Sequence, residues 1–208
     1  RYHPAFATCM AWITSGQIGT VQTLWAHFGV GIEDDGKKNQ YRPELGGGSI
    51  MDMGCYPLHW VTQLIPHTIK TMTVRATLAT SGVDESMKAE LSFDNGVSAM
   101  LSASMHPDMP FKATLEIVGS DGRVNFQNPL VPHQGGTLTL TNGAGTVAEH
   151  VSTVSTYCYQ LRAILDAITS NTALPTEGDA LLLQQEGIDR LYQEAGLAHL
   201  RRSTQTLL

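Results

Sequence analysis

The chain carries little charge, and most of that charge is acidic. Charged residues make up 15% of the sequence, with 13 Lys and Arg against 19 Asp and Glu, and the formal net charge is -6. A surface that binds nucleic acid needs clustered positive charge, so we expect no nucleic-acid partner. No apolar run approaches the roughly 18 residues that a membrane-spanning helix needs, so we expect no membrane partner either.

Cysteine is also scarce. The three cysteines, Cys9, Cys55 and Cys158, are far apart and odd in number. This is typical of reduced thiols rather than of a disulfide framework, and it predicts a cytoplasmic protein. The chain opens at Arg1 without an initiating Met, which we interpret as the start of a fragment of a longer protein.

The sequence also lacks a strand–GxGxxG–helix unit and a Walker-type loop. It does contain a glycine triplet, Gly46-Gly47-Gly48, but a polar loop rather than a strand precedes these glycines. We therefore expect the chain to bring no dinucleotide-binding fold of its own.

Helical spacing occurs towards the two ends of the chain, and strand-like alternation dominates its middle. Pro4 in a first turn predicts a helix over 4–15, and a second helix is predicted over 49–65. Asp94-Asn95-Gly96 is a strong hairpin signal. Strands are predicted over 21–28, 71–80, 86–93, 97–105, 112–118, 123–127, 137–141 and 146–151, and helices over 157–169 and 177–195. Together these elements predict one α+β domain over residues 1–208, with a large, mostly antiparallel, open-faced sheet and helices packed on one face.

Two finer expectations concern packing. Pro57 has no N–H to donate inside the helix over 49–65, which predicts a kink near Met53. The three tryptophans, Trp12, Trp25 and Trp60, are expected in the core or at the seam between sheet and helices.

The stretch from Gly46 to His59 carries the strongest functional signal. Ser49 follows the glycines as a preferred helix N-cap, and Asp52 stands three residues later in the pattern of a capping box. Tyr56 and His59 follow Asp52 at four and seven residues, so the three side chains share one helix face near the positive end of the helix dipole. A carboxylate, a phenol and an imidazole beside a glycine-lined opening indicate proton transfer.

The motif Gly46-Gly47-Gly48-x-x-x-Asp52-x-Gly54-x-Tyr56 resembles the second-domain signature of the glucose–fructose oxidoreductase / inositol dehydrogenase (Gfo/Idh/MocA) family. The segment from Arg1 to Val21 is similar to the part of the family that follows its cofactor domain. The resemblance implies a C-terminal domain for substrate binding and oligomerisation, preceded in the family by a Rossmann domain that binds NAD or NADP. Many members carry His at the position of Tyr56, and Tyr there resembles the glucose–fructose oxidoreductase, dihydrodiol dehydrogenase and xylose dehydrogenase branches.

The resemblance also implies roles for single residues. It implies hydride transfer between nicotinamide and a sugar, polyol or dihydrodiol carbon, with Tyr56 as the base that takes the hydroxyl proton. A phenol titrates near ~10, so Tyr56 needs a nearby cation. In the family a lysine of the missing domain supplies that cation, and the isolated chain is therefore expected to be inactive. Asp52 is assigned to catalysis, His59 and Arg42 to substrate binding, and Gly46–Gly48 to contact with the cofactor.

Each of these residues also has an interpretation without a function. Tyr56 fits a helix residue with its ring in the core and its hydroxyl satisfied, and Asp52 fits a capping residue. His59 fits a half-buried, hydrogen-bonded side chain. Cys55 and His59 have the spacing of two metal ligands on a helix, but no further candidates stand nearby, and we expect no metal.

The whole chain has rival interpretations as well. The family includes a transcriptional regulator that senses nucleotide without turnover, so a non-catalytic ligand-binding or regulatory protein is the alternative to an enzyme. A free-standing sheet domain that acts only in assembly is a third reading. In the family the open face of the sheet commonly pairs subunits, which implies a homodimer or a tetramer.

Overall fold

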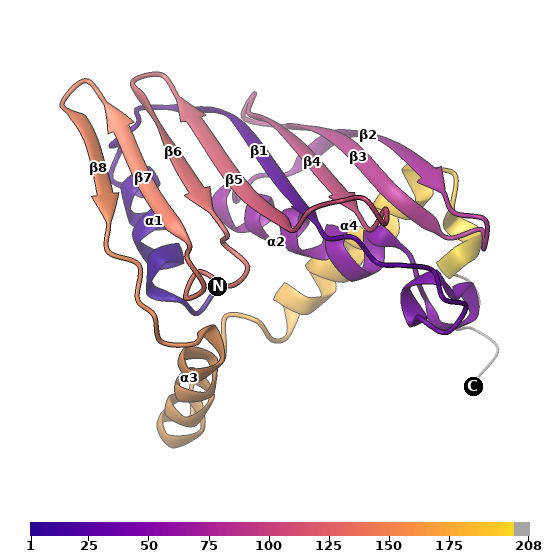
Figure 1. Ribbon diagram of the computed structural model, residues 1–208. Helices are drawn as coiled ribbons and strands as arrows, with labels where there is room; N and C mark the ends of the chain where they lie inside the picture. Colours follow the sequence, from indigo (N-terminus) through magenta and orange to yellow (C-terminus); the bar gives the residue numbers. More distant parts are fainter. Residues whose placement is uncertain (202–208) are drawn as a thin grey trace. The chain divides into compact units, whose positions relative to one another are not determined.

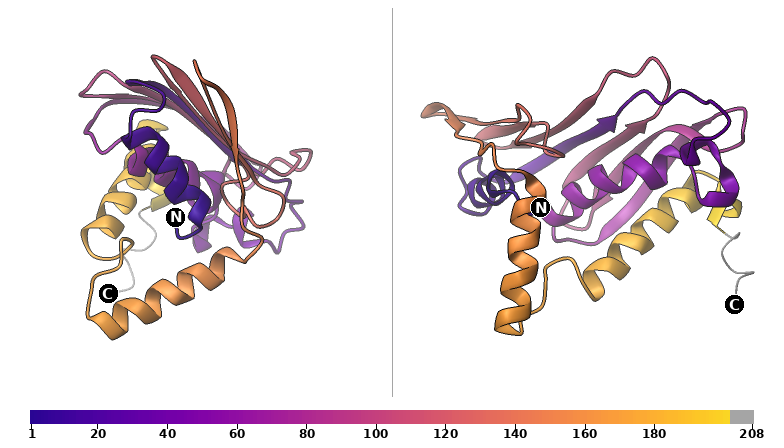
Figure 2. Two further views of the ribbon diagram at one scale, coloured as in Figure 1. Left: turned by 90° about the vertical axis from the view of Figure 1, so that its left-hand side faces the viewer. Right: turned by 60° about the horizontal axis from the view of Figure 1, so that its bottom comes forward.

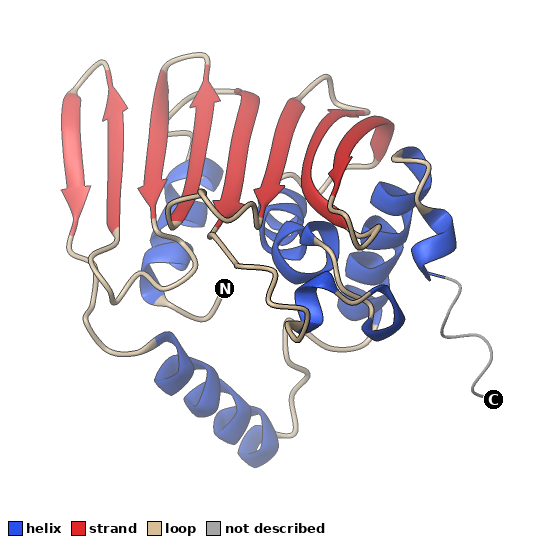
Figure 3. Cartoon of the chain, turned by 45° about the vertical axis from the view of Figure 1, so that its right-hand side comes forward, coloured by secondary structure: helices blue, strands red, loops and turns tan. Residues whose placement is uncertain are grey.

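The computed structural model describes residues 1–201, and its elements follow the polarity pattern of the sequence. Its helices are α1 (Pro4–Thr14), α2 (Cys55–Leu64), α3 (Thr156–Ser170) and α4 (Asp179–Glu194), and a π-helical segment, η3 (Ile50–Gly54), runs directly into α2. Two single-turn 3-10 helices, η1 (Asn39–Tyr41) and η2 (Pro43–Leu45), precede η3. The strands are β1 (Val21–Gly29), β2 (Ile69–Leu78), β3 (Asp84–Phe93), β4 (Ser98–Ser104), β5 (Lys112–Gly119), β6 (Gly122–Gln127), β7 (Thr137–Asn142) and β8 (Gly145–Glu149), drawn in red in Figure 3.

The eight strands form one sheet in the order β2-β3-β4-β1-β5-β6-β7-β8 (Figure 1). The pairs β2–β3, β3–β4, β5–β6, β6–β7 and β7–β8 are antiparallel. The predicted α+β fold with a large, mostly antiparallel sheet is therefore confirmed. The described chain forms two compact units, one of residues 1–25 and 113–183, and the other of residues 26–112 and 184–201.

In the second unit, large and small side chains alternate on the buried face of β3 and β4. Met87 stands opposite Ala103 in the strand register, and Ala89 stands opposite Leu101. The small residues leave room for η3 and α2, which pack against these strands (Figure 2). Gly54 lies at this contact: a Cβ there would lie 2.9 Å from the terminal methyl group of Met87, at the end of a flexible side chain.

The helices α2 and α4 also meet within the second unit. A Cβ at Gly187 of α4 would lie 2.9 Å from Cδ2 of Leu58, so the glycine lets α4 approach α2 closely. Trp60 of α2 and Leu191 of α4 are buried, as the core prediction for Trp60 requires. The second unit thus places the start of α2 between a strand pair and a second helix.

In the first unit, α1 packs against the strands and contacts β7. His3 caps this helix, since its Nδ1 accepts a hydrogen bond from the N–H of Ala5 at 3.2 Å. Its Nε2 lies 3.0 Å from the carbonyl oxygen of Ser152, and the ring edge contacts Tyr159. Burial lowers the pKa of His3, so the neutral ring serves both contacts, with Nε2–H as the donor to Ser152.

Trp25 contradicts the packing prediction. It is 40% exposed, whereas its strand neighbours Leu24 and Ala26 are buried. Successive side chains of a strand point to opposite faces of the sheet, so burial of Leu24 and Ala26 turns Trp25 to the other face. Trp12 of α1 is half-buried, consistent with a position at the seam.

The helix α3 has an apolar stripe that its own unit does not bury. Ser155 caps the helix by accepting a hydrogen bond from the N–H of Tyr157, and Asn171 ends it in a left-handed conformation at φ 50°. Leu161, Leu165 and Ile168 are nevertheless exposed. None of the helices within residues 1–201 is long and apolar enough to cross a membrane.

Candidate active site

The helical segment that carries Asp52 and Tyr56 changes from π to α geometry in its middle, where η3 ends and α2 begins. Pro57 has no N–H for the carbonyl of Met53, so the α-helical ladder is incomplete there, and the wider π turn lies beside this gap. The sequence predicts an irregularity at this place from Pro57. It does not predict the π geometry of η3, which packs against β3 and β4.

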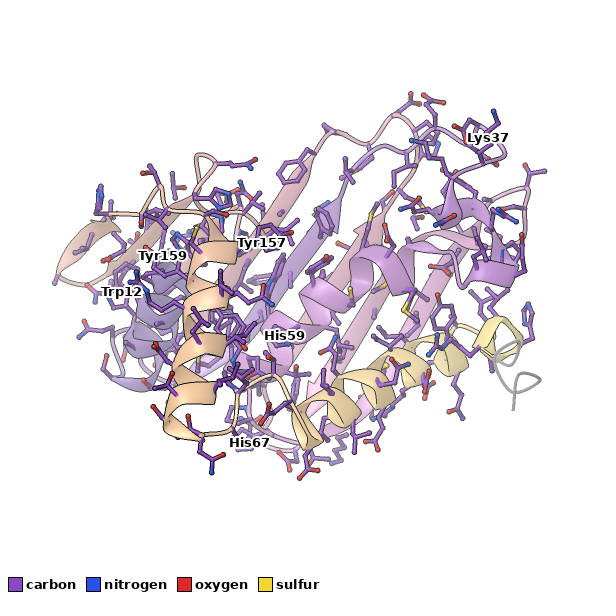
Figure 4. The ribbon with its side chains drawn as sticks, turned by 90° about the horizontal axis from the view of Figure 1, so that it is seen from below. Trp12, Lys37, His59, His67, Tyr157 and Tyr159 are labelled. Atoms are coloured by element: carbon purple, nitrogen blue, oxygen red, sulfur yellow. The ribbon has the colours of Figure 1, made fainter. Side chains whose placement is uncertain are left out.

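Asp52 and Tyr56 share the exposed side of this segment. Met53 and Gly54 between them are buried, and Tyr56 is 40% exposed. His59 follows on α2 and is half-buried (Figure 4). The structure thus brings the predicted carboxylate, phenol and imidazole together on one segment, and Tyr56 is not a core residue.

The capping box predicted for Ser49 and Asp52 is wrong. Ser49 already has helical dihedral angles, φ -67° and ψ -31°, and makes no cap with its side chain. Its buried hydroxyl donates to Oδ2 of Asp84 at 2.9 Å, and the N–H of Ile50 donates to the same oxygen at 2.6 Å. A carboxylate from β3 therefore caps the segment, which leaves Asp52 without a capping role.

The carboxylate of Asp52 faces the loop that follows β1. Its Oδ2 accepts a hydrogen bond from Nε2 of Gln40, at 3.4 Å. Gln40 carries no signal in the sequence, because a single amide in a polar loop resembles any other. The structure therefore adds Gln40 as a neighbour that orients Asp52.

The thiol of Cys55 lies beside this carboxylate. Burial, with the negative charge of Asp52 as a smaller cause, raises the pKa of Cys55 to about 11. The thiol is therefore protonated at neutral pH, and a protonated thiol is a poor metal ligand. Residues 1–201 contain no group of three or more His, Cys, Asp or Glu side chains that could hold a metal ion.

Tyr41 holds the loop before η3 in place. Its side chain is buried, and its hydroxyl lies 2.9 Å from the carbonyl oxygen of Ile32 and 3.2 Å from that of Met105. Arg42 beside it has a different environment: its Nε donates to Glu44 at 2.7 Å in an exposed ion pair. The structure thus pairs Arg42 with its own loop.

The three glycines of the motif have different surroundings. Gly46 has φ 72° and ends η2, and the position of a Cβ there has open space around it. At Gly47 a Cβ would meet the backbone oxygens of Asn39 and Gln40. At Gly48, where φ is 119°, it would collide with Oδ1 of Asp84. The fold itself therefore requires Gly47 and Gly48, whereas Gly46 faces outward.

An aromatic row borders the exposed side of Tyr56. The ring of Phe28 meets that of Tyr56 edge-on, with 5.4 Å between centroids, and meets that of Phe111 with 6.0 Å between centroids. Phe28 is buried at the end of β1, while Phe111 is 52% exposed. The sequence does not indicate this row, because its members are far apart in the chain and only the fold joins them.

A family model described as "GFO/IDH/MocA C-terminal domain" matches residues 6–125, which is 120 of the 208 residues. The chain belongs to the GFO/IDH/MocA family. The matched range includes Asp52, Tyr56 and the glycine triplet, and the family predicted from the sequence is confirmed.

Relatives of this GFO/IDH/MocA chain include named dehydrogenases. Trans-1,2-dihydrobenzene-1,2-diol dehydrogenase from Xenopus tropicalis is 28% identical over 170 residues, which cover 73% of this chain and 50% of that protein. D-xylose 1-dehydrogenase (NADP(+)) 2 from Haloferax volcanii is 23% identical over 198 residues, which cover 94% of this chain and 60% of that protein. The chain thus spans about half to three fifths of the length of these relatives.

Solved structures of the same fold are also known. Aldose-aldose oxidoreductase from Caulobacter crescentus, complexed with glycerol, has a TM-score of 0.84 at 20% identity, and the match covers 94% of this chain and 59% of that one. The 3-ketoreductase KijD10 from Actinomadura kijaniata, complexed with NADP and TDP-benzene, has a TM-score of 0.78 at 18% identity and covers 93% of this chain and 59% of that one. At this identity the likeness concerns the fold of the GFO/IDH/MocA chain.

Proposed function

We propose that residues 1–208 form the C-terminal domain of a nicotinamide-dependent oxidoreductase and bind its substrate, a sugar, polyol or dihydrodiol. The observation that carries this proposal is the exposed pair of Asp52 and Tyr56 on the π-to-α segment. Asp52 has no capping role, and Tyr56 has no place in the core. The relatives named as dihydrodiol and D-xylose dehydrogenases support the same reaction type.

The proposed reaction removes a hydride and a proton from an alcohol carbon and its hydroxyl. NAD or NADP, when bound, accepts the hydride, or supplies it in the reverse direction. As the C–H bond breaks, the O–H proton passes to the phenolate oxygen of Tyr56, and the alcohol becomes a carbonyl. Asp52 accepts a hydrogen bond from a substrate hydroxyl and orients the substrate. The cation that this proposal requires beside Tyr56 comes from outside this chain.

The residues present fit only one end of a nicotinamide dinucleotide. The chain has no strand–GxGxxG–helix unit for the phosphates. Of the three glycines, Gly46 alone has open space at its Cβ position. We therefore assign the cofactor contact to the backbone at Gly46, and assign Gly47 and Gly48 to the packing of the loop.

The aromatic row of Tyr56, Phe28 and Phe111 supports a substrate with an apolar ring face. An exposed aromatic side chain such as Phe111 offers a flat apolar surface, against which the C–H face of a pyranose or a cyclic diol can pack. His59, half-buried on the next turn, is the second polar side chain that we assign to substrate hydroxyls.

The substitution Tyr56→Phe in the full-length protein tests the proposed function. Because the phenolic oxygen is the proton acceptor, kcat should fall by about 100-fold or more, while the affinity for the cofactor changes little. The matched control is Tyr157→Phe, which removes a hydroxyl from an exposed tyrosine on α3 and should leave kcat unchanged. Steady-state kinetics measures kcat, and cofactor titration measures the affinity for the cofactor. Undiminished turnover in Tyr56→Phe would remove Tyr56 from the mechanism, and bound ligand without any turnover would favour a regulatory protein.

Two further proposals concern the whole protein. We propose a homodimer or tetramer that forms through the sheet face opposite α2, and Met100 on that face of β4 is 46% exposed. We also propose a cytoplasmic location. All three cysteines lie within the described residues and are free thiols, as a reducing compartment requires.

A further inference from the structure

Asp84 is a fully buried carboxylate at the first position of β3. Its Oδ2 accepts two hydrogen bonds from the start of the π-helical segment, from the N–H of Ile50 at 2.6 Å and from the hydroxyl of Ser49 at 2.9 Å. Its Oδ1 accepts no well-formed hydrogen bond from residues 1–201, and the hydroxyl of Tyr192 on α4 is the polar group that approaches it. The carboxylate thus links three elements of one compact unit.

A buried carboxylate at this place has a specific structural effect. The first N–H groups of a helix have no partner within the helix, and here the partner comes from a neighbouring strand. Ser49 is already helical, so no residue of the segment itself supplies the cap. The link therefore fixes the position and direction of η3 relative to β3. Asp52 and Tyr56 follow on the same helical segment.

The glycine at position 48 belongs to the same arrangement. Oδ1 of Asp84 occupies the place that a Cβ would take at Gly48, and the hydroxyl of Tyr192 lies 3.2 Å from that place. A glycine is therefore needed for the chain to pass over the carboxylate. The last glycine of the motif thus serves the link and leaves the cofactor contact to Gly46.

We propose that Asp84 is a positioning residue, which fixes the start of η3 through Ile50 and Ser49 and thereby sets the placement of Asp52 and Tyr56. The consequence for turnover rests on the proposed function, whereas the link itself does not. Asp84 touches neither substrate nor cofactor in this scheme. It acts through the helical segment alone.

Two substitutions in the full-length protein distinguish the loss of the hydrogen-bond acceptor at position 84 from the loss of its negative charge. Asp84→Ala leaves Ile50 and Ser49 without an acceptor, so kcat should fall about tenfold or more while the KM for the cofactor changes little. Asp84→Asn keeps an acceptor oxygen at the Oδ2 position and turns its NH2 group towards Tyr192, so it should restore most of kcat. If Asp84→Ala does not fold, Asp84→Ser takes its place, because a serine hydroxyl is too short to reach the nitrogen of Ile50.

Hydrogen exchange of the backbone amides tests the link without any activity. In Asp84→Ala, the amides from Ile50 to Tyr56 should exchange about tenfold faster, while those of β3 and β4 keep their protection. The matched control is Val74→Ala on β2, which removes buried apolar volume elsewhere in the unit. It should lower global stability and speed exchange evenly, with kcat unchanged.

The outcomes are distinguishable. Uniform loss of protection in Asp84→Ala, or an Asp84→Asn variant as slow as Asp84→Ala, would overturn the proposal. Faster exchange confined to Ile50–Tyr56 supports it, even in a protein whose turnover does not depend on Tyr56. In that case the proposed function fails and the positioning link stands.

Discussion

At the scale of single residues, the charge of Asp84 and the burial of Asp84 oppose each other. Burial raises the pKa of this carboxyl to about 6, although the bonds from Ile50 and Ser49 favour the charged form. Tyr192 is the titratable group that faces it from α4, and the guanidinium carbon of Arg201 lies 5.6 Å from the centroid of the Tyr192 ring. Near neutral pH the carboxylate is therefore charged at a cost to stability, which is expected of a residue kept for placement.

This raised pKa predicts how stability varies with pH. The folded value near 6 lies above the usual value of about 3.9, so the folded state binds more protons than the unfolded state between these limits. The raised pKa of Asp84 therefore adds up to about 3 kcal/mol to the free energy of unfolding. This stabilisation is fully present below about pH 4 and is lost as pH rises through 6. Thermal unfolding of the wild type and Asp84→Asn from pH 4 to 7 measures it.

As pH rises from 4 to 7, Asp84→Asn should become more stable relative to the wild type. The control is Asp166→Asn, which changes an exposed carboxyl on α3 and should give a curve parallel to that of the wild type. Parallel curves for the wild type and Asp84→Asn would show that Asp84 does not titrate in this range.

At the scale of elements, the segment from Gly46 to Leu64 shows where local sequence patterns no longer predict the hydrogen bonds of a helix. Ser49 with Asp52 is a good capping box by sequence, but the backbone of Ser49 is helical and its hydroxyl is taken by Asp84. The N–H of Ile50 then finds its acceptor on β3. A long-range partner therefore replaces a local one, and this frees Asp52 for the exposed side.

The glycine triplet yields a prediction at this scale. Gly48→Ala should destabilise the protein by about 2–4 kcal/mol, because its Cβ would collide with Asp84 and the backbone has a positive φ. Gly46→Ala should cost only about 1 kcal/mol, since the left-handed conformation is strained for alanine but space is free. Thermal or urea unfolding compares the two. Equal losses of stability in Gly48→Ala and Gly46→Ala would contradict the assignment of Gly48 to the packing of Asp84.

The boundaries of the elements could be predicted from the sequence more fully than the contacts between them. Asp94-Asn95-Gly96 lies between β3 and β4, with Gly96 at φ 86°, as the hairpin signal requires. The shared exposed side of Asp52 and Tyr56 could also be predicted, because their spacing is a local property. The partners of the site, Asp84, Gln40 and Phe111, could not be found, since each meets it only through the fold.

At the scale of the whole molecule, the open face of the sheet presents side chains that the chain itself does not cover. On β3 and β4 this face carries Lys88, Glu90 and Met100, which are exposed, whereas Met87, Ala89 and Leu101 on the other face are buried. A sheet with one face packed and one face free is suited to pairing with a second copy.

Pairing through this face predicts the effect of a charge at its centre. Met100→Glu in the full-length protein should shift the sedimentation coefficient towards that of a monomer, because a buried unpaired carboxylate opposes association. Leu45→Glu, at an exposed leucine of η2 outside the sheet, is the matched control and should sediment like the wild type. Met100→Glu with unchanged sedimentation would rule out this face as the interface.

The cap that Asp84 supplies also sets an order of events during folding. A peptide from Gly46 to Leu64 contains three glycines, an internal proline and no acceptor for the N–H of Ile50, so it has little tendency to be helical alone. The loop between Ser49 and Asp84 must close before the helix gains its cap, and closing this loop costs conformational entropy. We therefore expect the helical segment that carries Asp52 and Tyr56 to gain its cap only once β3 meets it.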